Sequence, residues 1–399
     1  MLNIDYTPVI LNLQDVLVKK IELIGETYII DIEMPLKEHN CPCCSSNTIK
    51  THDYRYQKIK DIPAFGANVI LNYRKRRYVC KECGKRFSEQ HPFVPKYYRM
   101  TNRLVADIIE KLKSEYSFTS VGQELNLSVS TVIRVFDLIN VPKPSKLPKV
   151  FAIDEFKGNT GKEKYQAIIT DPENKVVLDI LPCRNQEYLI SYLKQWSVSE
   201  RSNTKYFVSD MWQPYTDIAP IFFKESISII DRYHFIRQMV WAFDKVRKRI
   251  QKKYSKDYRK LFKSSRKVLI KHEENLKEWE KEKVNAILDL SDEMLLAYVL
   301  KEKFYKLMTC KNRDEAKKIM SEWILMAQNS KIPEYTDCAA TLTNWSVGIL
   351  NSFDVPYSNG FTEGCNNKIK VLKRNAYGYR NFKRFRNRIL HMFSDKKAS

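Results

Sequence analysis

The sequence predicts an α/β protein with a long all-helical insertion, preceded by a cysteine-containing β-ribbon and a helix pair. Three observations support this prediction. Two closely spaced cysteine pairs lie within β-rich sequence, helical periodicity follows from about residue 100, and short apolar runs that end in Asp begin at residue 150. A chain of 399 residues has enough sequence for two or three domains.

The charge balance points to nucleic acid as the partner. The chain has 69 Lys and Arg against 47 Asp and Glu, a formal net charge of +22, and proteins with such a surplus commonly bind polyanions. No apolar run is long enough to span a bilayer, and the N-terminal MLNIDYTPVI lacks the basic-then-apolar pattern of a signal peptide. We therefore expect a cytoplasmic protein with no membrane partner, whose cysteines do not form a disulfide framework.

Four cysteines have the spacing of a zinc site. Two cysteines separated by two residues turn both sulfurs of a tight turn toward one ion, and two such pairs complete a tetrahedral Zn²⁺ site. The predicted ligands are Cys41, Cys44, Cys80 and Cys83. Cys43 remains an alternative in the first pair, although its spacing is poorer. Hairpins are expected around Gly25-Glu26 and within residues 61–80, so residues 1–95 are predicted to form a zinc-binding ribbon.

Residues 96–140 have the pattern of a helix-turn-helix. An amphipathic helix is expected over residues 101–115. A helix pair follows. Val121 and Leu125 are predicted to form the inner face of its first helix, and Asn126-Leu127 the turn. Ser128 is predicted to be the N-cap of the second helix. The second helix would present to DNA the side chains of Ser130, Thr131 and Arg134. A plain structural helix pair has the same pattern and stays an alternative. Residues 141–149, rich in Pro and Lys, are predicted to be a linker.

From residue 150 the pattern changes to short strands. The expected strands cover residues 150–156, 165–170, 176–181, 205–209 and 226–230, with helices at 185–196 and from about residue 214. The resulting order, β-β-β-α-β-α-β, is that of a ribonuclease-H-like fold, in which a three-stranded meander is extended by two further strands through crossovers. The region 235–352 is predicted to be helical and to interrupt this core. Two interpretations of it remain open: a lobe that dimerises or clamps DNA, and a scaffold that only positions the last helices.

Two aspartates fall at the centre of the predicted sheet. Asp154 lies on the first strand, and Asp210 follows the fourth strand, which is the neighbour of the first in this topology. Carboxylates buried side by side repel each other unless a cation lies between them, so the arrangement predicts Mg²⁺. Glu155 is the rival to Asp154, because strand alternation turns only one of the two toward the metal. Asp231 follows the fifth strand, with His234 three residues later.

A third carboxylate comes from the C-terminal region. One helix is expected from an Asn359-Gly360 turn to about Asn375, and another begins near Asn381. Glu363 lies in the first turn of the former helix, whose same face then carries Asn367, Lys370 and Arg374. Such a face suits a carboxylate that helps to hold a divalent cation beside residues that touch a polyanion.

Four features in one order resemble the ISL3 family of bacterial insertion-sequence transposases: the CPCC and CKEC pairs, the helix-turn-helix, the strand AIDEF, and the terminal SNGFTEGCNNKIKVLKRNAYGYRNFKRFRNRIL. The resemblance covers nearly the whole chain, and the extra Cys43 is the departure from it. It implies a DDE transposase with a ribonuclease-H-like catalytic domain at residues 150–234 and 353–399 and a helical insertion at 235–352. The acidic triad would be Asp154, Asp210 and Glu363.

The resemblance also implies the chemistry. Two Mg²⁺ (or Mn²⁺) ions held by the triad would support attack by water at the transposon end and then attack of the freed 3′-hydroxyl on target DNA. Asp231 and His234 are similar to a motif found between the second Asp and the Glu in related families and would support catalysis, although a structural role suits His234 equally well. DNA backbone phosphates would be held by Lys370, Arg374, Arg380, Lys383, Arg384, Arg386 and Arg388.

The expected partners are the transposon's terminal inverted repeats, target DNA and further copies of the chain, as a homodimer or higher oligomer associated with the nucleoid. Two other functions are weighed against this one. A transposase-derived regulator that binds DNA without cutting it would not need the intact triad. A structure-selective nuclease on the same core would not explain two N-terminal modules of the kind that read DNA.

Overall fold

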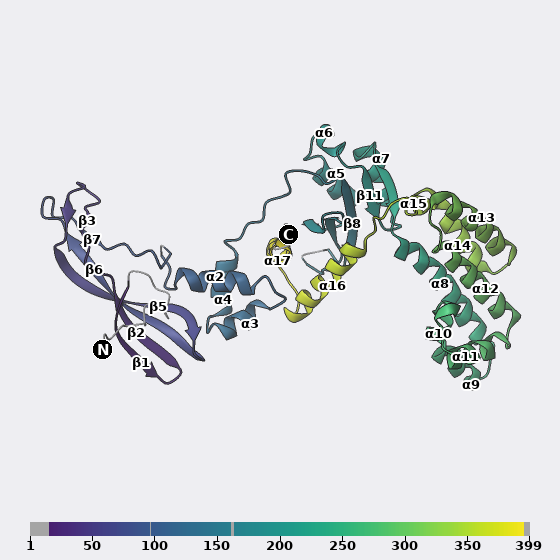
Figure 1. Ribbon diagram of the computed structural model, residues 1–399, viewed down its shortest axis with the longest axis horizontal. Coiled ribbons are helices and arrows are strands. Elements are labelled where there is room, and N and C mark those ends of the chain that lie inside the picture. Colours follow the sequence, from purple (N-terminus) through teal and green to yellow (C-terminus); the bar gives the residue numbers. More distant parts are fainter. Residues whose placement is uncertain (1–15, 96, 161–162, 395–399) are drawn as a thin grey trace. The chain divides into compact units, whose positions relative to one another are not determined.

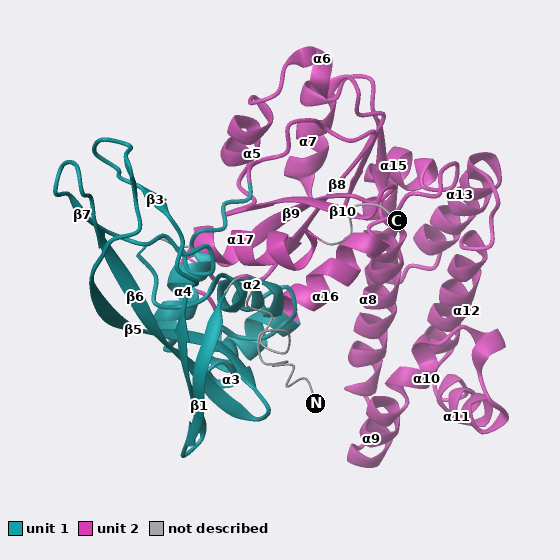
Figure 2. Cartoon of the chain, turned by 60° about the vertical axis from the view of Figure 1, so that its left-hand side comes forward, with its two compact units in different colours: residues 1–141, 371–377 teal, residues 142–370, 378–399 magenta. Residues whose placement is uncertain are grey.

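A computed structural model describes residues 16–95, 97–160 and 163–394 of the chain, in two compact units (Figure 1). One unit comprises the residues up to 141 together with 371–377, and the other comprises 142–370 together with the residues from 378 onward (Figure 2). Each unit has its own hydrophobic core. The predicted first and last domains extend into residues 1–15 and 395–399, which lie outside the described residues.

The first unit is built on a five-stranded sheet. Strands β1 (Leu17–Ile24), β2 (Thr27–Glu33), β6 (Ala67–Val79) and β5 (Thr51–Ala64) lie in that order, and β7 (Arg86–Ser88) pairs with β6. The hairpin predicted at Gly25 is confirmed, and this glycine has a φ of +60°, which residues with a Cβ rarely adopt. The second hairpin is longer than predicted, because β5 begins at Thr51 rather than at residue 61. The first half of β5 consists largely of polar and charged residues that pair with β6 through backbone hydrogen bonds. A search for apolar runs therefore does not reveal this part of the strand.

The predicted helix-turn-helix elements are confirmed. Helix α2 (Asn102–Lys111) is followed by α3 (Phe118–Glu124) and α4 (Val129–Phe136). Val121 and Leu125 are buried, and the Ser128 hydroxyl accepts a hydrogen bond from the Thr131 amide as the N-cap of α4. The turn between the helices is tight, because a Cβ on Gly122 would lie 2.8 Å from the carbonyl oxygen of Leu127. Helix α2 ends at Lys111, four residues before the predicted Glu115, so the C-terminal end of this helix differs from the prediction.

The second unit contains the predicted ribonuclease-H-like core. Its sheet has the order β10-β9-β8-β11-β12, in which β9 and β10 are antiparallel to their neighbours and β8, β11 and β12 are parallel to one another. The strand bounds are β8 Val150–Phe156, β9 Gln166–Asp171, β10 Val176–Leu181, β11 Tyr206–Ser209 and β12 Ile227–Ile230. The first strand of the meander is therefore central, as the topology predicts, and β11 lies directly beside it.

Helices cover both faces of this sheet. On one face, α5 (Gln186–Leu193) and α7 (Gln213–Phe222) pack against the buried side chains of Phe151, Ile153 and Phe207. A short helix between them, α6 (Val198–Arg201), was not predicted. On the other face lies the first part of α16 (Gly360–Asn375), whose Thr362 hydroxyl is 2.8 Å from that of Thr170 on β9. Helix α17 (Phe382–Met392) packs along β10.

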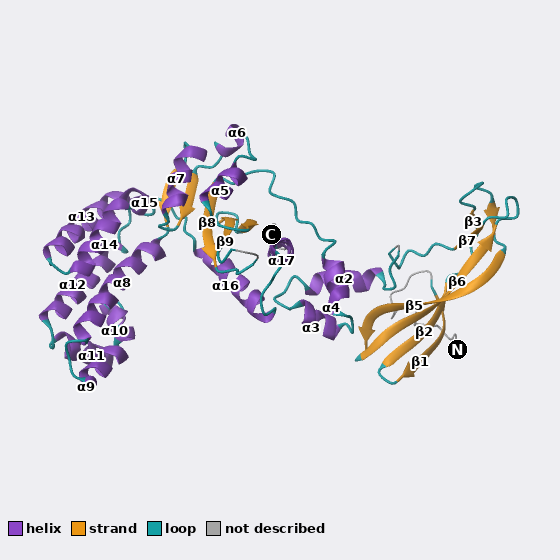
Figure 3. Ribbon diagram, turned by 180° about the vertical axis from the view of Figure 1, so that it is seen from behind, coloured by secondary structure: helices purple, strands orange, loops and turns teal. Residues whose placement is uncertain are grey.

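The predicted helical insertion forms a bundle with its own core (Figure 3). Its helices are α8 (Arg232–Gln251), α9 (Lys256–Ser264), α10 (Arg266–Ile270), α11 (Glu278–Leu288), α12 (Asp292–Leu307), α13 (Arg313–Asn329), α14 (Pro333–Asn344) and α15 (Ser346–Asn351). The bundle begins at Arg232, three residues before the predicted start. It meets the sheet through α15, where Gly348 allows close approach: a Cβ there would lie 2.7 Å from the side chain of Ile230.

Candidate active site

Strand alternation on β8 separates Asp154 from Glu155. Val150 and Ala152 belong to the apolar cluster on the α16 side of the sheet, whereas Phe151 and Ile153 belong to the cluster under α5 and α7. Because side chains alternate along a strand, Asp154 lies on the α16 side and Glu155 on the opposite side. The Glu155 carboxylate forms an ion pair with Arg184 there. Of the two rival strand carboxylates, the structure therefore places Asp154 on the face that carries Glu363.

The register of the parallel strands places three aspartates in one row. Tyr206 pairs with Val150 and Val208 with Ala152, so one further step of two residues brings Asp210 beside Asp154. On the other side of β11, Ser209 pairs with Ile230, and the Asp231 amide donates to the Ser209 carbonyl at 3.0 Å. All three aspartates thus lie at the carboxyl ends of parallel strands, the edge where α/β sheets place their ligands.

Helix α16 brings a fourth carboxylate to this row. The Asn366 side-chain amide donates to Asp154 Oδ2 at 2.9 Å, and the backbone amide of Asn359, just before the helix, donates to Asp231 Oδ1 at 2.9 Å. Glu363 lies three residues before Asn366, in the first turn, and its side chain is exposed. Residues three apart lie on one helix face, so these contacts hold Glu363 close to the row.

The carboxylates of this acidic row, Asp154, Asp210, Asp231 and Glu363, lie in an environment that raises the pKa of the three aspartates. Burial is the main cause that raises the pKa of Asp154 to about 6, and the neighbouring carboxylates of Glu155, Asp231 and Glu363 add to it. Burial and then the charges of Asp154 and Glu155 raise the pKa of Asp210 to about 7, against the opposing effect of Arg237 and Arg184. Burial also raises the pKa of Asp231. Near neutral pH Asp210 is therefore about half protonated, and Asp154 takes up its proton about one pH unit lower, until a cation compensates their charge.

Buried oxygen atoms around the row match the needs of a hard divalent cation. Among the described residues, Asp210 Oδ1, Asn359 Oδ1 and Asn366 Oδ1 are buried and have no hydrogen-bond partner. Carboxylate and amide oxygens are the ligands that Mg²⁺ and Mn²⁺ take. No three of the carboxylates converge closely: in the described ranges only a set of four cysteines brings three or more potential ligand atoms within 4.8 Å.

His234 lies on the first turn of α8 and contacts a cation rather than the aspartates. Its Nδ1 is 3.0 Å from Nη2 of Arg237, and burial followed by the charge of Arg237 lowers its pKa to about 4. The imidazole is therefore neutral, with Nδ1 as the acceptor. The described structure gives it no hydrogen bond to the carboxylate of Asp231. Its geometry is that of a residue that orients Arg237, which in turn acts on Asp210.

The four predicted cysteines lie together in the first unit. Cys41, Cys44, Cys80 and Cys83 bring their sulfurs within 4.8 Å of one another, with three S···S separations of 3.5 Å. Four sulfurs around Zn²⁺ would be about 3.8 Å apart at the usual Zn–S distance. Both pairs form the same turn: the Ser45 amide donates to Cys41 O and the Gly84 amide to Cys80 O, and both residues have positive φ. Cys43 lies outside the group.

Most residues predicted to contact DNA are accessible. Ser130 and Arg134 on α4 are exposed, whereas Thr131 is half-buried and bonded to Ser128. Near the C-terminus the exposed side chains are Lys370, Arg374, Arg380 and Lys383, and Arg384 is half-buried.

Two side chains expected to contact DNA have partners or burial within the catalytic domain. Arg388 is completely buried, and Arg386 donates from Nε to the buried carboxylate of Asp179 on β10 at 2.6 Å. Helix α17 packs along β10, where Arg386 meets Asp179, and Arg388 lies on another face of the helix, near Tyr379.

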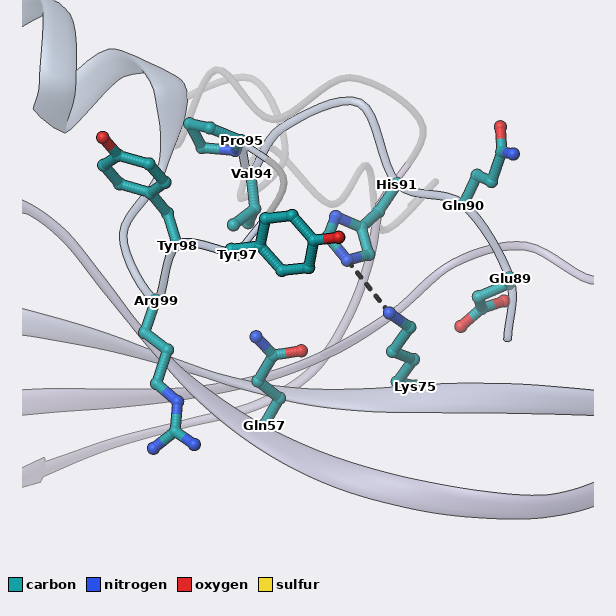
Figure 4. Close-up of a pocket in the computed structure, with 10 residues that line it drawn as sticks. All are labelled: Gln57, Lys75, Glu89, Gln90, His91, Val94, Pro95, Tyr97, Tyr98 and Arg99. Atoms are coloured by element: carbon teal, nitrogen blue, oxygen red, sulfur yellow. Dashed lines mark hydrogen bonds between the residues drawn. The ribbon is translucent and has the colours of Figure 1, made fainter. Parts of the chain in front are cut away.

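A polar cavity of about 690 Å³ lies in the first unit and was not predicted (Figure 4). It opens between the sheet residues Gln57 and Lys75 and the segment from Glu89 to Arg99. Figure 4 shows Lys75 reaching His91, whose Nε2 is 3.3 Å from the ammonium nitrogen. Within the basic run Arg74–Arg77, Lys75 therefore faces this cavity, and Arg76 is buried with its guanidinium bonded to the Met34 carbonyl.

Sequence reasoning also missed the buried partners of the carboxylates. Asn367 was placed on the face of Glu363, but it is exposed, and the amide that reaches Asp154 is that of Asn366. Positions three and four residues after Glu363 are both its helical neighbours, so either choice was consistent with the spacing. No sequence pattern indicated that Arg184 and Arg237 lie near these carboxylates, because only their charge is visible in the sequence.

Three family models match the chain in order. A zinc-finger model of transposases IS204, IS1001, IS1096 and IS1165 matches residues 37–83, a helix-turn-helix model of the ISL3 transposase family matches 89–140, and the ISL3 model described as "Transposase" matches 151–389. The last of these alone covers more than half of the sequence. The chain belongs to the ISL3 transposase family.

The IS1001 and IS1557 relatives agree with this assignment. The transposase for insertion sequence element IS1001 of Bordetella parapertussis is 27% identical over 367 residues, which is 89% of each chain. The transposase for IS1557 of Mycobacterium tuberculosis is 33% identical over 118 residues, 30% of this chain and 26% of its own length. A shorter match, 38% over 108 residues, is to a protein of Lactococcus lactis subsp. lactis named as an ATP-dependent protease, and it covers 27% of this chain and 33% of that protein.

The protein is therefore an insertion-sequence transposase, an enzyme class that cleaves and joins DNA, with a DNA-binding helix-turn-helix and a zinc ribbon. The four-cysteine group fits a structural Zn²⁺, and the family implies a divalent metal in the catalytic domain. None of the helices in the described ranges has the length and apolar character needed to cross a membrane.

Proposed function

We propose that Asp154, Asp210 and Glu363 are the acidic triad of this transposase and bind two Mg²⁺ (or Mn²⁺) ions. The main support is the row at the carboxyl ends of β8 and β11, together with the Asn366 contact that holds the helix of Glu363 against it. The ions would activate the attacking oxygen and stabilise the leaving oxygen at phosphorus. The unpartnered oxygen of Asp210 and the raised pKa of both aspartates suit carboxylates that bind a divalent cation.

In this proposal each residue has a distinct part. Asp154, central in the sheet and fixed by Asn366, would bridge both metal sites, while Asp210 and Glu363 would each complete one. Asp231 would support the row by holding the start of α16 through the Asn359 amide. Water is the first nucleophile and releases a 3′-hydroxyl at the transposon end. That hydroxyl then attacks a target phosphodiester, so no covalent enzyme intermediate forms.

We further propose that the ribbon and α4 bind the element's terminal inverted repeats, with Ser130, Thr131 and Arg134 facing the bases. Lys370, Arg374, Arg380, Lys383 and Arg384 would hold backbone phosphates and add salt-dependent affinity without sequence reading. Transposition would join two ends in an assembly of at least two chains on cytoplasmic, nucleoid-associated DNA. Nothing in the comparisons favours the alternative of a regulator that binds DNA without cutting it.

Single substitutions of the triad test the proposal. On a DNA fragment that carries the gene with both of its flanking repeats, Asp154→Ala, Asp210→Ala and Glu363→Ala should each abolish Mg²⁺-dependent cleavage, whereas gel-shift binding to the ends should persist. Asp257→Ala is the matched control, since this carboxylate is 90% exposed on α9. Cleavage at the wild-type rate by any one of the three variants would refute the role of that residue.

A further inference from the structure

We propose that Arg184 binds a phosphate of the DNA strand at the acidic row, and that Glu155, Tyr165 and Trp212 hold its guanidinium in place for this contact. The inference rests on the proposed function of that row. It assigns a substrate-binding role to a residue outside the triad, and it gives Glu155 a function other than metal binding.

Arg184 is enclosed by three separate segments of the catalytic domain. It lies in the loop between β10 and α5, and its guanidinium carbon is 4.7 Å from the ring centroid of Tyr165 and 4.7 Å from that of Trp212. Its Nη1 forms the ion pair with Glu155. Tyr165 directly precedes β9 and Trp212 directly precedes α7. An arginine held by two rings and a carboxylate has lost most of its rotamer freedom before any ligand arrives, so binding costs little further entropy.

These contacts place the cation beside the reacting carboxylates. Glu155 follows Asp154 on β8 but points to the opposite face, so Arg184 lies at the same end of the sheet as the row, and Trp212 follows Asp210 by two residues. The positive charge of Arg184 also acts on Asp210, since it lowers the pKa of that carboxyl against the effect of burial. A strand whose scissile phosphate reaches the row would therefore bring a phosphate within reach of this guanidinium.

Part of the guanidinium remains available to a ligand. The group has five N–H donors, and the hydrogen bond found among the described residues uses Nη1 alone. The other nitrogens are not buried, and the side chain is 29% exposed. Arginine presents its donors in a planar fork that matches two phosphate oxygens, which a lysine ammonium does not.

Electrostatics explains why such a group is needed. Four carboxylates surround the site, namely Asp154, Asp210, Asp231 and Glu363, and they repel a DNA phosphate at short range. The fifth, Glu155, lies on the opposite face of the sheet and is paired with Arg184. Arg184 and Arg237 are the cations that act on Asp210. Arg237 is directed elsewhere: it donates to His234, it lies over the rings of Tyr233 and Trp241, and its Nε is buried. Of these two arginines, Arg184 is the one whose guanidinium has N–H donors available to a ligand.

The experiment combines protein variants with neutralised phosphates. Duplexes of the transposon end would carry a methylphosphonate at single positions around the cleavage site, and single-turnover cleavage would be measured in Mg²⁺. In the wild type, neutralising the contacted phosphate should slow cleavage about 10- to 100-fold, the usual range for one charge-assisted contact. Arg184→Ala should lose a similar factor on unmodified DNA and should then be insensitive to that methylphosphonate.

A structural role would give a different result. If Arg184 only holds Glu155 and Trp212 together, the losses from Arg184→Ala and from the methylphosphonate should multiply at every position, which would overturn the proposal. Cleavage by Arg184→Ala at the wild-type rate would overturn it as well. Glu155→Gln removes the carboxylate that holds the guanidinium but leaves the N–H donors of Arg184 in place. This variant should therefore lose less activity than Arg184→Ala and stay sensitive to the methylphosphonate.

Two controls separate this inference from other causes. Arg201→Ala removes an arginine that stacks on Phe222, 4.9 Å from its ring, but lies on α6 away from the row, and it should cleave like the wild type. If Arg184→Ala fails to fold, Arg184→Lys keeps the charge and should lose about 10-fold in rate and most of the phosphate sensitivity; a wild-type rate would contradict the proposal. If Asp154→Ala also cleaves normally, the triad itself is wrong. If only Arg184→Ala does, the error is confined to this inference.

Discussion

The side-chain amide of Asn366 donates a hydrogen bond to Asp154 Oδ2 at 2.9 Å, across 212 residues of sequence. Asn366 is almost completely buried, and its own oxygen has no partner among the described residues. This bond ties α16, which carries Glu363, to the central strand of the sheet. The distance between the last carboxylate and the first two is therefore set by a neutral residue, and it can be changed without altering any of the acids.

Asn366→Ala should uncouple the helix from the strand. Loss of the donor leaves a buried carboxylate oxygen unpaired, which should cost about 1 to 3 kcal/mol of folding free energy and about 10-fold or more in cleavage rate. Weaker binding of Mn²⁺, measured by calorimetry, would distinguish misplaced ligands from simple destabilisation. Asn367→Ala is the matched control, because its side chain is exposed on the same helix. Equal Mn²⁺ affinity in both variants would contradict the coupling.

Asp210→Asn should stabilise the protein at pH 8 when no divalent ion is added. The pKa of Asp210 is raised from 3.8 to about 7, so between these pH values the folded protein binds this proton more tightly than the unfolded chain does. The free energy of unfolding therefore falls as the pH rises through this window, and Asn removes the loss, which is on the order of 4 kcal/mol over the whole window and about 3 kcal/mol between pH 5 and pH 8. Urea unfolding at pH 5 and pH 8 measures the difference.

Divalent ions should reverse this dependence in the wild type, because they bind the ionised carboxylates and stabilise the folded state more at pH 8 than at pH 5. Asp217→Asn, an exposed carboxylate on α7, should behave like the wild type. The same pH dependence in Asp210→Asn and in the wild type would show that this group is not the one that titrates.

Cys41→Ser or Cys83→Ser should release zinc, whereas Cys43→Ser should retain it. The first two are in the four-sulfur group, and the third is exposed outside it. Because the metal holds the two turns together, its loss should unfold the tip of the ribbon and weaken binding to the transposon ends about 10-fold. Zinc content per chain, measured by elemental analysis, decides the point. A protein purified without zinc, or zinc loss from Cys43→Ser alone, would refute the ligand set.

Arg380→Gln and Arg386→Gln should act on different properties. Arg380 is exposed, so its loss should weaken DNA binding for all sequences and reduce the slope of log affinity against log salt by about 1. Arg386 is the partner of the buried Asp179, so its loss should instead cost about 3 kcal/mol of stability. Titrations at several salt concentrations and thermal unfolding separate the two. A reduced salt slope in a folded Arg386→Gln protein would mean that this side chain does reach DNA.

Local sequence was sufficient for most of the architecture. Strands β8 and β10 have the predicted bounds, and Asn375 and Asn381 mark the end of α16 and the N-cap of α17, because periodicity and capping depend on residues close together in the chain. The acidic row was also predictable, since Asp154, Asp210 and Asp231 each lie on or directly after a strand of recognisable topology.

Tertiary structure alone decided which side chains meet. Alternation required that Asp154 and Glu155 face opposite ways, but only the packing of α5, α7 and α16 showed which of them lies beside Glu363. Helical spacing allowed Asn366 or Asn367 as the inward amide, and burial selected Asn366. The charge of Arg386 and Arg388 suggested DNA contacts, but Arg386 pairs with Asp179 on β10 and Arg388 is completely buried. Charge and period are properties of the chain, whereas the partner of a buried polar group depends on which surface covers it.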